Sequence, residues 1–242
     1  MAKILILGAF GSGKSSSIYK SEKLGIKGLN PEETFLITVT SKPLPLKGGS
    51  KLYKICDPSV APTKENGNRM ITNSGPFIAK TMMYVSNNRP EIKNIVIDDA
   101  NYVMQDYYMA NAATKGYETF KQIGMDFYAI FAAAENLRPD INFIMLAHYE
   151  EYKDSNADTI SFRFKTVGKM VQDYLSPEGK FENVFFTKQV FNQQDKKVEK
   201  FFVTNYDGQY PAHCAADIFD DIYIPNDLGY VVEKINQFQN EL

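Results

Sequence analysis

Short apolar runs alternate with longer amphipathic stretches along the first part of this chain. Four runs are rich in hydrophobic and β-branched side chains, as in strands buried on both faces: residues 3–7, 34–39, 94–99 and 141–146. Between the last two runs, apolar residues recur at steps of three and four over residues 117–137, the period of an amphipathic helix. Strands that alternate with helices predict a mainly parallel sheet with helices on both faces, an α/β fold of three layers.

Weaker patterns fill the positions between these elements. Residues 15–20, closed by Gly25, predict a first helix, and residues 76–85 predict another. The alternating residues 51–56 predict a weaker strand. Residues 58–73 carry Gly, Asn, Lys and Pro without a clear period, and they predict a surface excursion.

The last third of the chain changes to β-rich runs and loops. Residues 182–190 and 198–204 are two such runs joined by a polar stretch, which predicts a β-hairpin. A loop with Pro and Asp follows over residues 207–226, and residues 227–238 predict a closing helix.

Length and composition fit one large domain. The 242 residues are 44% hydrophobic and 13% aromatic, which is enough for a sizeable core. We therefore expect a single domain over residues 1–242, with a core over 1–150 and the hairpin, loops and closing helix over 151–242. The net charge of −2 excludes a globally basic nucleic-acid-binding protein, so any DNA contact must be local.

Two cysteines and the character of the N-terminus bear on the compartment. Cys56 and Cys214 lie far apart and fit neither a disulfide framework nor a zinc-ligand spacing, which indicates buried or free thiols in a reducing compartment. The sequence shows no charged segment followed by a long apolar one at its start, and no run approaches the about 20 apolar residues of a membrane span. A cytoplasmic protein without a membrane segment is expected.

The segment after the first predicted strand fits the pattern G-x-x-x-x-G-K-[ST]. Its glycines allow several backbone N–H groups to point at one phosphate, reinforced by the positive end of the helix that follows. Lys14 adds a positive charge for the β- and γ-phosphates, and the Ser15 hydroxyl is placed to ligate Mg²⁺. The alternative is a glycine-rich turn that matches by chance. The residues expected to hold the nucleotide are Gly8, Ala9, Phe10, Gly11, Ser12, Gly13, Lys14, Ser15 and Ser16.

Polar residues also end the predicted strands beside this loop. A site for a magnesium nucleotide needs a carboxylate at a neighbouring strand end, and Asp98 ends an apolar run there, although a strand-ending turn residue is the alternative. Asp99 follows as the acid that polarises the attacking water, or alternatively as a helix N-cap. His148 follows another apolar run, either as a γ-phosphate sensor or as a plain loop histidine.

With these motifs in this order, the chain resembles the RecA-like P-loop ATPases. Within that group it is similar to the small phage-encoded recombination ATPases of the Sak single-strand-annealing type. The resemblance rests on residues 8–15, the strand that ends in Asp98 and Asp99, and the strand that ends in residues 147–150. It extends to the late hairpin and the segments after it, and so covers nearly the whole chain, but only the first motif is specific.

The resemblance implies ATP hydrolysis with Mg²⁺, homo-oligomers with the nucleotide at a subunit boundary, and contact with single-stranded DNA during recombination. Carried to this sequence, Lys14 and Ser15 become phosphate and Mg²⁺ ligands, Asp98 the Walker B residue and His148 the γ-phosphate sensor. A phage origin would place the protein in the host cytoplasm. One departure matters: RecA proteins carry a catalytic glutamate after the second strand, whereas residues 39–43 contain no acid. Hydrolysis is then slow, or depends on Asp99.

The segment Phe162, Arg163, Phe164 and Lys165 is the candidate for contact with DNA or with a neighbouring subunit. Its aromatic side chains are suited to stacking on bases and its cations to binding phosphates. Arg163 or Lys165 alternatively reaches a neighbouring subunit's site as a trans cation. A third interpretation is a short edge strand with both phenylalanines inward and the cations in solvent.

Three functions therefore remain open. The first is a Mg-dependent ATPase that acts on single-stranded DNA. The second is a small-molecule or nucleotide kinase, which the scattered positions of Arg69, Arg89, Arg138 and Arg163 count against, because kinases need arginines converging on the acceptor phosphates. The third is a nucleotide-bound assembly or structural component that barely turns ATP over.

Overall fold

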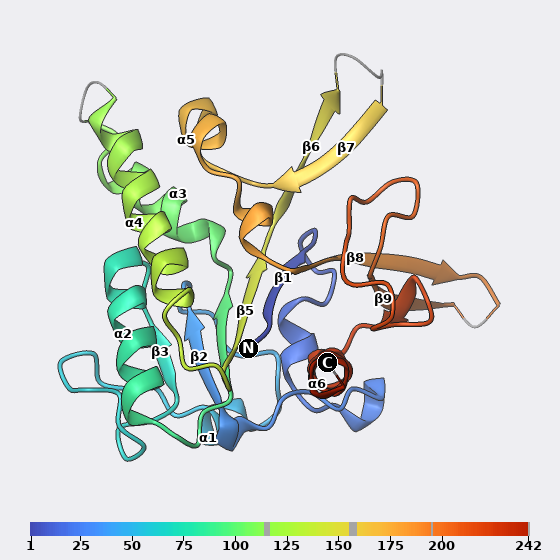
Figure 1. Cartoon of the computed structure of the whole chain (residues 1–242), viewed down its shortest axis with the longest axis horizontal. Helices are drawn as coiled ribbons and strands as arrows, with labels where there is room; N and C mark the ends of the chain where they lie inside the picture. Colours follow the sequence, from blue (N-terminus) through green and yellow to red (C-terminus); the bar gives the residue numbers. More distant parts are fainter. Residues whose placement is uncertain (114–116, 155–158, 195, 242) are drawn as a thin grey trace.

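One large sheet organises the protein, whose computed structural model describes residues 1–113, 117–154, 159–194 and 196–241 (Figure 1). Its eight strands lie in the order β10-β9-β8-β1-β5-β4-β2-β3. In chain order they are β1 (Lys3–Leu7), β2 (Thr34–Thr38), β3 (Arg69–Ile71), β4 (Asn94–Asp98), β5 (Asn142–Ala147), β8 (Asn183–Asn192), β9 (Lys197–Val203) and β10 (Tyr223–Pro225). The strands from β8 to β3 pair in parallel, whereas β9 and β10 are added by antiparallel pairing at one edge.

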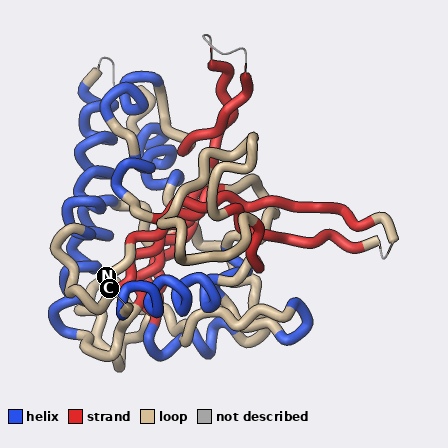
Figure 2. The backbone as a smooth tube through the Cα atoms, turned by 45° about the vertical axis from the view of Figure 1, so that its right-hand side comes forward, coloured by secondary structure: helices blue, strands red, loops and turns tan. Residues whose placement is uncertain are grey.

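Helices cover both faces of this sheet, as the tube view shows (Figure 2). On one face lie α2 (Gly75–Asn88), α3 (Asn101–Ala110) and α4 (Glu118–Ala134), which pack on a cluster that includes Leu5 and Phe143. On the other face α6 (Leu228–Asn240) packs on a cluster that includes Ile4 and Ile144. Because successive strand residues enter opposite clusters, β1, β2, β4 and β5 are buried along their whole length. The expected three-layer α/β fold, a mainly parallel sheet with helices on both faces and a C-terminal hairpin, is confirmed.

A second, two-stranded sheet stands on the carboxyl end of β5. It pairs β6 (Tyr149–Asp154) antiparallel with β7 (Thr159–Phe164), and it projects from the main sheet in Figure 1. The sequence pattern did not predict β6 or α3, and the loop predicted over residues 207–226 contains the short strand β10, which pairing with β9 fixes. The short elements are α1 (Gly49–Leu52), α5 (Lys169–Tyr174) and the 3₁₀ turns η1 (Ser15–Ile18), η2 (Glu22–Leu24), η3 (Pro31–Glu33) and η4 (Pro177–Lys180).

The helix predicted over residues 15–20 is wrong: only the single 3₁₀ turn η1 forms there. The Ser17 hydroxyl donates to the carbonyl of Lys14, an alternative to continued helical bonding that serine side chains often provide. Tyr19 is already extended, and the chain then folds into a bridge between Ser21 and Ile26. A turn this short has almost no macrodipole, so anion binding at the loop must rest on its own amides and on charged side chains.

Two further predictions need correction. Residues 51–56 do not form a strand, since α1 occupies the start of that range and only Ile55 bridges to Arg69. The excursion predicted over residues 58–73 ends in the edge strand β3, which pairs in parallel with β2. An edge strand this short carries too few residues to show a period, and the pairing with β2 is what fixes it.

The other predicted elements agree with the structure to within a few residues at their ends. α2, α4, the β8–β9 hairpin and α6 are all present, and the side chain of Asp227 caps α6 by accepting from the N–H groups of Gly229 and Tyr230. Asp195, in the predicted hairpin turn, lies outside the described residues. Cys56 and Cys214 are free thiols. Among the helices of the described residues, none is long and apolar enough to cross a membrane.

Candidate nucleotide-binding site

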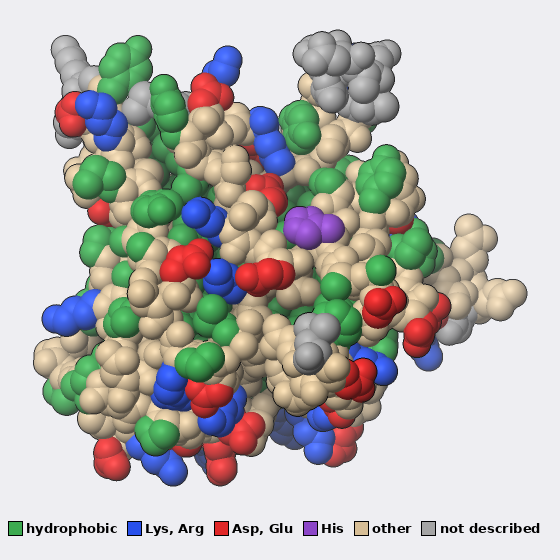
Figure 3. All heavy atoms as spheres, in the orientation of Figure 1, with side chains coloured by type: hydrophobic (Ala, Val, Ile, Leu, Met, Phe, Trp, Pro, Cys, Tyr) green, Lys and Arg blue, Asp and Glu red, His purple; other side chains and the backbone are tan. Residues whose placement is uncertain are grey.

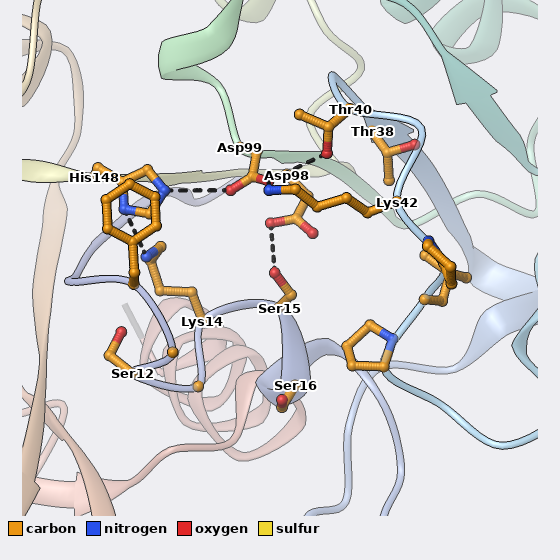
Figure 4. A pocket seen from close by; sticks show the side chains of 16 residues that line it. Ser12, Lys14, Ser15, Ser16, Thr38, Thr40, Lys42, Asp98, Asp99 and His148 are labelled. Carbon is orange, nitrogen blue, oxygen red and sulfur yellow. Dashed lines mark hydrogen bonds and ion pairs between the residues drawn. The ribbon is translucent and has the colours of Figure 1, made fainter.

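A cavity of about 290 Å³ lies at the carboxyl ends of β1, β2, β4 and β5 (Figure 4). In an open, mostly parallel α/β sheet this edge is where ligands bind, because the strand-end loops converge there. The cavity is lined by residues 10–16, Thr38, Thr40, residues 42–45, Asp98, Asp99 and His148. The structure therefore brings together in one place the loop and the three strand-end residues that the sequence singled out.

Glycines give the loop after β1 its shape. Gly8 passes so close to β8 that a Cβ on it would lie 2.0 Å from Thr187 Oγ1. Gly11 and Gly13 adopt φ values of +71° and +101°, a region that side chains disfavour. A Cβ on Gly13 would also lie 2.8 Å from Lys200 Cδ. These positions let the loop turn tightly around the space that the cavity provides.

Lys14 is buried against the loop that carries it. Its side chain donates to the carbonyls of Gly8 (2.7 Å) and Ala9 (2.9 Å), and it lies 3.2 Å from His148 Nδ1. Burial lowers the pKa of Lys14 to about 8, although the nearby charges of Asp99 and Asp98 oppose this. An ammonium has three N–H donors, and two of those of Lys14 are engaged by the loop's own carbonyls.

Ser15 and Asp98 form the contact on which a metal assignment rests. The Ser15 hydroxyl donates to Asp98 Oδ1 over 3.0 Å, and Asp98 is buried at the end of β4. Burial is the main cause that raises the pKa of Asp98 to about 6, with the negative charge of Asp99 adding to it. A hydroxyl and a carboxylate are the hard oxygen ligands that Mg²⁺ prefers, and Mg²⁺ usually takes only one or two protein ligands beside phosphates. Ser15 and Asp98 fit this ligand set.

Asp99 faces the same cavity in an unusual backbone conformation. Its φ of +64° turns the side chain toward Lys42 Nζ (3.1 Å), Thr40 Oγ1 (3.3 Å) and His148 Nε2 (3.5 Å). Burial alone would raise the pKa of Asp99, but His148 and Lys42 together outweigh it and hold this pKa at about 2. The N-cap interpretation is wrong, because α3 begins without any side-chain cap. Asp99 is thus an ionised acid at the cavity wall.

His148 connects the two sides of the site. Its ring is buried beneath Phe10, with ring centroids 4.1 Å apart, and lies between Lys14 and Asp99. The side chain of Asn101 holds the backbone of His148 by accepting from its N–H and donating to its carbonyl. His148 lies between β5 and β6 with a buried side chain, and its role, as γ-phosphate sensor or as a plain loop histidine, stays a prediction.

Sequence reasoning missed Lys42, Thr40 and Asn101. The first two follow β2, the strand adjacent to β4, so they reach the same sheet edge as Asp98. That position was the available signal, because carboxyl ends of parallel strands meet at one edge. Nothing local in the sequence indicated that Asn101, in the first turn of α3, would hold the backbone of His148.

The segment predicted to stack on DNA bases is instead part of the core. Phe162 and Phe164 are 4% and 1% exposed, and Phe164 packs on Phe127 with ring centroids 5.7 Å apart. Arg163 pairs with Glu150 over 2.9 Å, whereas Lys165 is exposed. The stacking prediction is wrong, and the edge-strand interpretation of an inward aromatic pair is confirmed. On the face in Figure 3, the charged side chains of the described residues mix both signs.

Comparisons with known proteins add a likeness in fold only. No family model matches the sequence, and no curated protein matches it. Among solved structures, the chain is similar to a KaiC-like protein, PH0186, from the hyperthermophilic archaeon Pyrococcus horikoshii OT3. The two share 11% identity with a TM-score of 0.43, over 84% of this chain and 79% of that one. The site is therefore assigned on the geometry of this chain's own residues.

Proposed function

We propose that this protein binds ATP with Mg²⁺ and hydrolyses it. The observation that carries the proposal is the 3.0 Å contact between Ser15 and Asp98, beside the glycine loop and Lys14, in one cavity at the carboxyl ends of parallel strands. Hydroxyl, carboxylate, backbone amides and a lysine are the groups that bind a magnesium triphosphate.

Each group has a distinct part in the proposed reaction. The amides over residues 11–16 and Lys14 would hold the phosphates, while Ser15 and Asp98 would hold Mg²⁺. The metal would neutralise charge on the phosphate oxygens as the reaction proceeds. Asp99, ionised and at the cavity wall, orients a water and accepts its proton as the water oxygen bonds to the terminal phosphorus. The bond from that phosphorus to ADP then breaks, and its electron pair leaves with ADP.

The positions of the arginines favour water over a second phosphate-bearing acceptor. All four arginines are described, and none lines the cavity. Arg69 and Arg89 are buried with donors committed to Thr38, Glu91 and backbone carbonyls. Arg138 bonds to Asp140, and Arg163 to Glu150. The cavity has no arginines converging on the position of an acceptor phosphate, as a nucleotide kinase needs, so we set that function aside.

The finer function that the resemblance implies is action on single-stranded DNA in phage-type recombination, by an oligomer. The burial of Phe162 and Phe164 removes the stacking residues on which the DNA part depended. Action on single-stranded DNA stays a prediction with a direct test. Single-stranded DNA should raise ATP turnover, and DNA binding should weaken steeply with salt. If DNA changes neither turnover nor oligomeric state, the protein is an ATPase that does not act on DNA. If ATP turnover is also negligible, the protein is a nucleotide-bound assembly component.

Calorimetry tests the nucleotide site itself. Titration with Mg·ATP should give saturable binding to the wild type, weak or no binding to Lys14→Ala, and unchanged binding to Lys20→Ala, whose side chain is 73% exposed. Far-UV circular dichroism should show that all three proteins are folded. A single-turnover experiment then measures hydrolysis. The absence of any binding to the folded wild type, or equal binding by Lys14→Ala, would refute the proposal.

A further inference from the structure

Lys42 stands on the wall of the cavity opposite the phosphate loop (Figure 4). The backbone around it is anchored to the sheet, because Arg69 donates from Nη2 to the carbonyl of Lys42 (3.0 Å) and from Nε to Thr38 Oγ1 (3.2 Å). Arg69 itself is 4% exposed. Pro43 and Pro45 restrict the segment that follows. The position of Lys42 is therefore built into the fold, although its side chain reaches into open space.

The two lysines that line the cavity are engaged differently. Lys14 donates to two carbonyls and lies 3.2 Å from His148 Nδ1. Among the described residues, Lys42 donates to one acceptor, Asp99 Oδ2 over 3.1 Å, and its side chain is 62% exposed. Its ammonium also lies 5.2 Å from the ring centroid of Tyr102. Lys42 thus has N–H donors left for a ligand in the cavity.

The charges of the cavity favour a second cation beside a bound triphosphate. Asp98 and Asp99 both face the space that the terminal phosphate would enter, and two carboxylates repel it. Lys14 lies on the loop side, bonded to the loop's own carbonyls. Lys42 approaches from the other side and already pairs with the acid nearest to it. Its flexible stem allows the ammonium to move from this carboxylate to a ligand that carries more negative charge.

We propose that Lys42 is a second phosphate-binding residue. When a triphosphate binds, the Lys42 ammonium moves away from Asp99 and contacts the terminal phosphate instead. This inference rests on the proposed function, because it concerns the same cavity. Lys42 then distinguishes a nucleoside triphosphate from a diphosphate, which lacks the phosphate that it contacts. The same movement releases Asp99 to orient the water, so that the acid becomes available only when the phosphate to be attacked is present.

Binding measurements with two nucleotides test this role without relying on turnover. Lys42→Met keeps much of the apolar stem and removes the charge, and Lys47→Met is the matched control, since Lys47 is an exposed lysine in the segment that follows. In calorimetry, Lys42→Met should weaken Mg·ATPγS by about tenfold or more, the cost of one lost charge-assisted contact. It should change Mg·ADP by less than about threefold. Lys47→Met should change neither, and Lys42→Arg should keep most of the preference for the triphosphate.

The Asp99→Asn variant, which lacks the Asp99 charge, shows whether Lys42 contacts the phosphate directly or acts only through Asp99. If Lys42 only neutralises Asp99, adding Lys42→Met to Asp99→Asn should have no further effect on Mg·ATPγS affinity. If Lys42 binds the terminal phosphate, the double variant should still lose about tenfold relative to Asp99→Asn alone. No loss in that background, or an equal loss for ADP and ATPγS, would overturn the inference. Wild-type protein that binds neither nucleotide would instead refute the proposed function.

Discussion

Replacing Asp98 by Asn should make the nucleotide-free protein more stable while removing its response to Mg²⁺. Asp98 is buried at the end of β4, where it accepts a hydrogen bond from the Ser15 hydroxyl at 3.0 Å. An asparagine has the same shape and can accept the same hydrogen bond through its carbonyl oxygen. The substitution therefore removes a buried charge and leaves the packing nearly unchanged.

The size of the effect follows from the pKa of Asp98. Burial, with the charge of Asp99, raises this pKa from 3.8 to about 6. Each pKa unit corresponds to about 1.4 kcal/mol, so keeping the carboxylate ionised in the folded state costs about 3 kcal/mol. Below about pH 4 the group is protonated in both the folded and the unfolded state, and the cost is absent. It grows as the pH rises from about 4 to about 6 and is complete above that range.

Urea unfolding in EDTA, followed by far-UV circular dichroism, measures this cost. At about pH 7.5 we expect Asp98→Asn to unfold with a free energy about 1–3 kcal/mol greater than the wild type, and at about pH 4.5 the difference should shrink. Asp217→Asn is the control, because it removes the same charge from an exposed position. Mg·ATP should raise the melting temperature of the wild type but not that of Asp98→Asn.

The comparison of the two pH values is the decisive result. If Asp98→Asn is no more stable than the wild type at about pH 7.5, the carboxylate is not costly where it stands. An advantage that stays the same at both pH values would mean that the ionisation of Asp98 is not its cause. Either outcome would refute the reasoning from burial.

Two other predictions concern stability alone. Burial alone would raise the pKa of Asp207. Lys188, which donates to Asp207 over 2.8 Å, and other hydrogen-bond donors outweigh burial and hold this pKa at about 2. Asp207→Asn should therefore lower the free energy of unfolding by about 1–2 kcal/mol at pH 7, and the deficit should close as the pH falls from about 4 to about 2; a deficit independent of pH would contradict this. Phe164→Ala should cost about 3–5 kcal/mol in urea unfolding because Phe164 is 1% exposed in the core, and a cost below about 1 kcal/mol would mean that β7 does not pack as described.

The sequence by itself determined the parallel core and the central part of the site. A buried parallel strand is an uninterrupted apolar run, so local composition alone predicts β1, β2, β4 and β5. Because such strands end at one edge of the sheet, the loop after β1 and the acids after β4 had to meet. The contact between Ser15 and Asp98 follows from that rule and from the loop motif alone.

Only the tertiary structure decided what surrounds that contact. The phenylalanines of β7 fit an exposed stacking surface as well as a buried face, and the packing of β7 against α4 settled the choice. Likewise, Lys42 reaches Asp99 because Arg69, far along the chain, fixes the segment after β2. Local patterns record the period of a strand or helix, but such contacts join residues distant in sequence. Their geometry is set by the packing of the whole sheet, which a single segment of sequence does not contain.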